Sequence, residues 1–318
     1  MHTREQMLTR IIRRLALAAV AAGFAVSSAA QPVRVPGTKV RLAPPDGFSV
    51  AQQYPGFERA EDRASIMVTE LPVSAPAMAR SMTRPALATK GMTLISASDP
   101  VIAGTPARLL HVRQQGPRGE VLKWILVAGD TKTTFMIVGT FADGGSQEIG
   151  ESIRQSLLTA SWNGAAAAPS PFEGLPFRMT PTAKLKLARR VSNMLMFTES
   201  GTPGTPGATE ALYIAGHSIG QGQIGDTRAF SETRVRQTTA ARGVTNVKGR
   251  PLLLEGLDAY ELEADASDAR SGRAMRLYQV IIPDQTGYFI LQGFIRADRA
   301  AEIVPEFKAL TSRFRLHP

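Results

Sequence analysis

Residues 124 to 139 read WILVAGDTKTTFMIVG, and residues 278 to 293 read YQVIIPDQTGYFILQG. The two stretches align without a gap: an aromatic residue opens each, Phe135 faces Phe289, and Gly139 faces Gly293. Each contains an apolar run, a short polar turn and a second apolar run, which is typical of two antiparallel strands joined by a turn. The chain therefore contains one structural unit twice, and this duplication decides the fold.

The repeat extends outward from these hairpins over most of the chain. Residues 40 to 50 (VRLAPPDGFSV) align with residues 177 to 187 (FRMTPTAKLKL), and each segment reads as a strand, a turn and a strand. Such long internal similarity predicts two diverged copies of one module. Further matches pair residues 66–68 with 212–214, Lys90-Gly91 with Arg242-Gly243, Pro100 with Pro251, and Ile149 and Ile153 with Ile303 and Phe307.

Each copy is predicted to contain a helix after its opening hairpin, then three strands and a terminal helix. The first helix is expected over residues 75–90, interrupted by Pro85, and its counterpart over residues 227–242, capped by Asp226. Short polar turns join consecutive strands, so those strands run antiparallel. The predicted class is α+β, with two tandem modules that are each an antiparallel sheet flanked by helices, an α/β/α sandwich.

The module boundary is expected near Asn163 to Pro171, where the chain is rich in alanine and interrupted by prolines, as linkers are. The predicted organisation is a signal peptide (residues 1–30), a first module (31–165), a linker (166–170) and a second module (171–318). The 288 residues after the signal are enough for two domains of ordinary size.

Several features together resemble the PsbP-like (Mog-type) family, once per copy. They are the turn of residues 44–48 (PPDGF), a helix ending at glycine, residues 104–107 (GTPA) before a strand, the aromatic-bearing strands and the final helix. The resemblance implies an antiparallel sheet between helices and a role as a binding or assembly factor, with no catalytic residue to carry over. The chain departs from the family at Phe48, where tryptophan is common, and the second copy lacks the turn glycine.

The first 30 residues predict export. Four arginines and one glutamate lie within residues 1–14, an apolar run covers residues 15–26, and Ser28-Ala29-Ala30 is a small-residue cleavage site. Arg13-Arg14 also allows a twin-arginine signal, although Leu15-Ala16-Leu17 fits that signal poorly. No later segment is apolar over the roughly 20 residues of a spanning helix. A periplasmic or secreted chain beginning near Gln31 is expected, with no membrane span.

Composition narrows the possible chemistry and partners. The chain has no cysteine, so disulfides and thiol chemistry are excluded. Without residues 1–30 it keeps 33 basic and 26 acidic residues, a net charge of +7 spread over both halves. Even spreading favours a weak attraction to anionic surfaces over a nucleic-acid groove. No cofactor is predicted.

Residues 216–220 (Gly216-His217-Ser218-Ile219-Gly220) form a G-x-S-x-G motif after a predicted strand, as in serine hydrolases. That motif needs a helix directly after the serine, yet the next helix is expected only near Thr227. The one later histidine is His317. A serine hydrolase using Ser218 is therefore the alternative to the preferred non-enzymatic interpretation.

Other candidate sites are weaker. The histidines are scattered and do not have the spacing of a zinc site, and residues 265–268 (DASD) lack the oxygen pattern of a calcium loop. Glu261, Glu263 and Asp265 alternate with apolar residues, and we interpret them as a solvated strand face offset by nearby arginines. No catalytic or metal-binding residue is predicted.

A cationic patch is the predicted binding surface. Lys184, Lys186 and Arg190 are expected on one side of a strand, with Arg189 nearby and Arg234 on the following helix. Such a patch suits an acidic protein or an anionic component of the bacterial envelope. The sequence thus favours an exported, non-enzymatic binding or accessory protein with an unknown protein or anionic envelope partner; a purely structural role is a third class.

Overall fold

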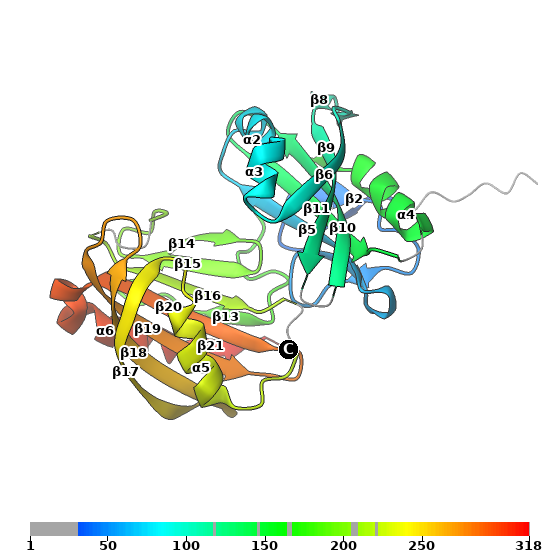
Figure 1. The fold of residues 1–318 in the computed structure, drawn as a ribbon. Helices are drawn as coiled ribbons and strands as arrows, with labels where there is room; N and C mark the ends of the chain where they lie inside the picture. The colour runs from blue at the N-terminus through cyan, green and yellow to red at the C-terminus, as the bar shows by residue number, and fades with distance from the viewer. Residues whose placement is uncertain are drawn as a thin grey trace, which may run out of the picture. The chain divides into compact units, whose positions relative to one another are not determined.

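Two seven-stranded sheets, antiparallel throughout, dominate the computed structural model, which describes residues 31–317 apart from 117–118, 145–146, 164–166, 205–208 and 220–221 (Figure 1). The described residues from Pro32 onward belong to one unit. The predicted signal peptide, residues 1–30, lies outside the described residues. Within the described part of the chain, no helix is both long and apolar enough to cross a membrane.

Both sheets have the same strand order. The first runs β3 (Ser49–Val50), β4 (Gly56–Arg59), β5 (Ala64–Leu71), β11 (Thr134–Ala142), β10 (Gly119–Gly129), β9 (Arg108–Gly116) and β6 (Met92–Ser98). The second runs β14 (Lys186–Val191), β15 (Met194–Thr198), β16 (Leu212–His217), β20 (Tyr288–Arg296), β19 (Ala274–Pro283), β18 (Leu257–Asp268) and β17 (Ala241–Leu254). Each strand of the first sheet thus has a counterpart at the same place in the second sheet.

Small sheets repeat as well. β2 (Val40–Leu42) pairs with β1 (Val33–Arg34) and with β12 (Ser161–Trp162), which follows the last helix of the first copy. Its counterpart β13 (Phe177–Met179) pairs with β21 (Phe314–Leu316), which follows the last helix of the second. A short hairpin of β7 (Val101–Ile102) and β8 (Thr105–Pro106) has no separate counterpart, because β17 and β18 are longer than β6 and β9.

The helix that follows the opening strands of each copy begins where the sequence predicts, at Ala75 and at Thr227, but ends earlier. The first copy has α2 (Ala75–Ser81), α3 (Arg84–Ala88) and α4 (Gln147–Leu158), and the second has α5 (Thr227–Arg236) and α6 (Ala300–Thr311), with 3-10 turns η1 (Ala60–Asp62) and η2 (Ala297–Arg299). Asp226 caps α5 by accepting from the Ala229 N–H at 2.9 Å, as predicted. The expectation that this helix reaches Arg242 is wrong, because residues from Ala241 onward pair with β18 instead.

Helices pack against both faces of each sheet. In β19, Tyr278 lies in the core that contains Phe307 of α6, and the preceding Leu277 lies in the core that contains Val235 of α5. Successive residues of a strand point to opposite faces, so α5 and α6 cover opposite faces of the second sheet (Figure 1). The first sheet likewise has two separate cores. One contains Ile153 of α4, and the other contains Leu87 of α3.

Candidate functional site

A β-bulge separates the residues predicted to form the cationic patch. The register of β14 shifts between Leu187 and Arg189, so Lys186 lies opposite Thr198 and Arg190 lies opposite the core residue Leu195. One extra residue reverses the alternation of side chains that follows it. Arg190 therefore lies on the face opposite to Lys186, and the expectation that they share one side of the strand is wrong.

The other four predicted residues are also dispersed. Lys184 forms an ion pair with Glu302 of α6 at 3.4 Å. Lys186 is exposed, Arg189 is half-buried, and Arg234 lies half-buried in the last turn of α5. A cation there also stabilises the helix dipole. Whether these residues bind a partner stays a prediction.

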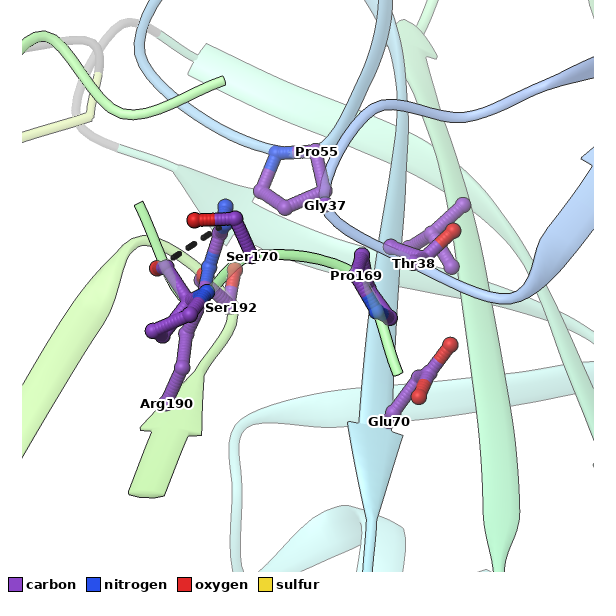
Figure 2. A pocket seen from close by; sticks show the side chains of 10 residues that line it. Gly37, Thr38, Pro55, Glu70, Pro169, Ser170, Arg190 and Ser192 are labelled. Atoms are coloured by element: carbon purple, nitrogen blue, oxygen red, sulfur yellow. Dashed lines mark hydrogen bonds between the residues drawn. The ribbon is translucent and has the colours of Figure 1, made fainter. Parts of the chain in front are cut away.

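Arg190 lines a cavity of about 190 Å³ and uses most of its donors on backbone carbonyls (Figure 2). Its Nε donates to the Ser192 carbonyl at 2.6 Å, and its Nη1 donates to the carbonyls of Pro171, at 3.3 Å, and Glu173. Burial lowers the pKa of Arg190 to about 10, against the opposing charges of Glu173 and Glu70, so the group is charged at neutral pH. Arg190 thus anchors the segment that follows the predicted linker.

Gly37 packs directly on this anchor. Its φ is +73°, and a Cβ at this position would lie 2.4 Å from Nη1 of Arg190 and 2.6 Å from the Glu173 carbonyl oxygen. Glu173 also forms an ion pair with Arg34 of β1. The cavity therefore belongs to a packed structural contact, in which Nη2 of Arg190 is buried without a hydrogen-bond partner.

The G-x-S-x-G segment has a different geometry from a nucleophile elbow. His217 ends β16, and its Nε2 bonds Oδ2 of Asp284 at 2.8 Å while its Nδ1 bonds the Ser218 carbonyl at 2.7 Å. The Ser218 hydroxyl accepts from the Tyr288 N–H at 3.0 Å. Both ring nitrogens are thus occupied by other partners, and the next helix begins at Thr227 as predicted. This arrangement fixes the β19–β20 turn and gives Ser218 no base from His217.

The strand acids do not form one solvated face. Glu261 is only 5% exposed and accepts from the Tyr278 hydroxyl at 2.9 Å and from Nε of Arg250 at 2.6 Å. Glu263 and Asp265 both pair with Arg276, at 3.3 and 3.0 Å. The expectation of solvation is therefore wrong for Glu261, because α6 covers this face. Among the described residues, no group of three possible ligands is gathered that could hold a metal ion.

A groove of about 850 Å³ lies between the start of α5 and strand β17. Pro251 and Tyr260, which are cross-strand partners, form part of its apolar wall. Its acids are committed, because Asp226 caps α5 and Glu232 pairs with Arg228 at 3.0 Å, while Lys248 also lines the groove. The volume falls within the range of about 300–1,000 Å³ that is usual for ligand sites. Because its acids are already bonded, the groove suits binding better than acid–base chemistry.

One hairpin in each repeat exposes an apolar side chain, and the two exposed positions are equivalent. Val101 is 70% exposed and Leu253 is 67% exposed, the highest values for large apolar side chains among the described residues. Each stands two residues before a two-residue turn with positive φ at both positions, Ala103-Gly104 and Glu255-Gly256. We call Val101 and Leu253 the tip residues. Sequence reasoning missed both, because the alignment of Pro100 with Pro251 pairs Val101 with Leu252, whereas the turns make Val101 equivalent to Leu253.

Leu253 also continues the groove. Leu253 pairs with Asp258 and is two residues from Pro251, so both side chains lie on the face covered by α5. The neighbouring Leu252 and Leu254 turn the other way and pack partly against the core beneath α6. On one face of this part of β17 the side chains thus pack against the core, and on the other face Leu253 is exposed.

Comparisons with known proteins leave the family open. No protein-family model matches the chain, and no curated protein matches it in sequence. Similar solved structures include the apo immunity protein TplEi of the T6SS from Pseudomonas aeruginosa, with 10% identity over 88% of this chain and 95% of that chain and a TM-score of 0.36. The Tle4-Tli4 complex has 10% identity, coverages of 84% and 95% and a TM-score of 0.35.

A shorter similar structure is LpqN, involved in cell envelope biogenesis of Mycobacterium tuberculosis. It has 13% identity over 45% of this chain and 83% of its own, with a TM-score of 0.30. All three TM-scores are below 0.5. The resemblance to the PsbP-like family stays a prediction.

Proposed function

We propose that this chain is an exported, non-enzymatic protein of the bacterial envelope that binds another protein through the tip residues Val101 and Leu253. The observation that carries the proposal is their shared position. Each repeat places its most exposed large apolar side chain two residues before the same kind of turn. A single exposed apolar residue needs no explanation. Equal exposure at the same place in both copies would be an unusual coincidence if these residues had no function.

The geometry around each tip supports a binding role. Next to Val101, Ile102 is only 3% exposed and packs in the core that contains α4. Next to Leu253, Leu254 packs partly against the core that contains α6. Each tip therefore has a neighbour that is packed against the core, buried at Ile102 and partly buried at Leu254, so its exposed side chain needs little ordering when a partner docks.

Strand addition is a poorer explanation of binding. The edge strand β17 has register shifts between Arg242 and Thr245 and between Thr245 and Lys248, and Pro251 has no N–H to donate. Bulges, a lysine and a proline are the usual means by which an edge strand avoids pairing with another chain. The partner is therefore expected to meet side chains at the tip and in the α5–β17 groove, not to extend the sheet.

Location in the periplasm, or secretion, is part of the proposal. It is supported by the charged and apolar regions of residues 1–26 and by the small residues before Gln31. The net charge of +7 after residue 30 would add a weak attraction to acidic partners.

The proposal can be tested by site-specific photo-crosslinking in intact cells. A photoreactive amino acid is placed at position 101, at position 253 or at the control position Val73, which is 43% exposed. We expect a crosslinked protein from 101 and 253 that is absent from 73. Val101→Ser and Leu253→Ser should weaken capture of that same protein by purified chain, and Val73→Ser should not. Equal crosslinking at all three positions, or capture unchanged by both tip substitutions, would contradict the proposal.

A further inference from the structure

A second hollow lies on the other face of β17 and β18, beneath α6, with a volume of about 230 Å³. Four cationic side chains line it from three elements: Lys248 and Arg250 from β17, Arg276 from β19 and Lys308 from α6. Two carboxylates, Glu261 and Glu263, complete the charged lining. These six groups have a formal charge of +2, and Asp265 on the same strand face, which pairs with Nη2 of Arg276 at 3.0 Å, lowers the net charge to +1.

Both carboxylates are already paired. Glu261 accepts from Nε of Arg250 and from the Tyr278 hydroxyl, at 2.6 and 2.9 Å. Glu263 accepts from Nη1 of Arg276 at 3.3 Å and pairs with Nζ of Lys308 at 2.7 Å. These bonds hold the cations in place and leave little negative charge to repel an incoming anion.

Several cationic donors are not used. Lys248 is exposed and makes no hydrogen bond or ion pair to the residues that the structure describes. Arg250 bonds Glu261 through Nε alone, and its side chain is 66% exposed. Nε of Arg276 is buried without a partner. The hollow thus has more N–H donors than its own acceptors can satisfy, which is the condition for binding an anion.

The bulge in β17 brings Lys248 to this hollow. The register shift between Thr245 and Lys248 places Lys248 opposite Glu263, on the same face as Arg250 and Glu261. Bulges often re-aim a side chain beside a functional site. Without this shift, Lys248 would point to the α5 face.

From this arrangement we infer that the hollow binds a phosphate monoester group. Such a group has a charge of about −1.5 to −2 at neutral pH, opposite in sign to the hollow, and three oxygens that can accept from the spare donors. The volume is below the roughly 300 Å³ at which small-molecule pockets begin, so it accommodates a phosphate with few further atoms. This inference does not depend on the tip residues.

Isothermal titration calorimetry on the mature chain tests the inference, with glycerol 1-phosphate and inorganic phosphate as probes at constant ionic strength. A second arm uses phosphatidylcholine vesicles with and without phosphatidic acid, which distinguishes a lipid headgroup from a soluble phosphate. Lys248→Gln should bind the probes about tenfold more weakly, the loss of one charge-assisted contact. Lys132→Gln, at an exposed lysine in the turn between β10 and β11, is the matched control.

Binding of either soluble probe that Lys248→Gln weakens and Lys132→Gln leaves unchanged supports the site with a soluble source. Vesicle binding that needs phosphatidic acid and shows the same dependence supports it with a lipid source. No binding of any probe overturns the inference. So does binding that both substitutions weaken equally, because that would be general attraction to a basic protein.

Discussion

Two glycines at equivalent positions allow the last helix of each repeat to approach its sheet. A Cβ on Gly139 in β11 would lie 2.1 Å from Cγ2 of Ile153 in α4, and one on Gly293 in β20 would lie 2.4 Å from the ring of Phe307 in α6. The sequence alignment already pairs these glycines and these apolar residues. Their contact is therefore one structural feature that both copies contain.

Gly139→Ala and Gly293→Ala should each destabilise the protein. Adding a methyl group in a packed core costs about 1–3 kcal/mol, which outweighs the entropy that alanine saves in the unfolded chain. The free energy of unfolding from urea titration measures the effect. Gly225→Ala is the control, because a Cβ there meets nothing within 4 Å. Unchanged stability in both core variants would mean that the helices do not pack as described.

Asp284 makes the stability of the fold sensitive to pH in the acid range. Burial would raise its pKa, but hydrogen bonds from His217 and the Thr286 N–H outweigh burial and hold the pKa below its ordinary value. Such a carboxyl stabilises the fold above its unfolded pKa of about 3.9, and this stabilisation is lost as the pH falls through the lower folded pKa. Between about pH 5 and pH 3, the wild type should lose more stability than Asp284→Asn. Chemical unfolding at both pH values tests this, and equal losses would disprove it.

At the scale of elements, hairpin turns and bulges decide where side chains point. The β7–β8 turn places Ala103 at φ +48° and Gly104 at φ +77°, and the β17–β18 turn places Glu255 at φ +52° and Gly256 at φ +76°. Positive φ at both central positions is the pattern of a type I′ turn, in which Asn-Gly is favoured. The first residue of each turn is therefore not the preferred one.

Ala103→Asn should stabilise the first repeat by about 0.5–1 kcal/mol, because asparagine adopts the left-handed region more readily than alanine. Ala103→Val should have the opposite effect, since a β-branched residue is disfavoured there. Thermal unfolding of the two variants beside the wild type gives the comparison. Identical melting temperatures for all three would show that this turn contributes nothing to stability.

At the scale of the whole molecule, the same strand order in both sheets predicts two separate folding units. Residues 31–165 and 171–318 each contain one seven-stranded sheet and its helices, and each is long enough to bury most of its apolar surface. Each fragment should unfold cooperatively when expressed alone, as measured by circular dichroism on heating. The ion pair of Arg34 with Glu173 is lost on separation, but an exposed pair contributes only about 0–1 kcal/mol. Two unfolded fragments from a stable whole chain would indicate one interdependent domain.

The amino-acid pattern alone predicts the duplication, the antiparallel strands and the starts of α2 and α5, because apolar periodicity, turn residues and caps act over a few neighbouring residues. It predicted neither the bulge that separates Arg190 from Lys186 nor the burial of Glu261. Only the tertiary structure decided these, since a bulge depends on the register of two strands and burial depends on which helix covers the face. The exposure of the tip residues also depends on tertiary packing, and the cationic hollow forms because strands and a helix far apart in the sequence bring its side chains together.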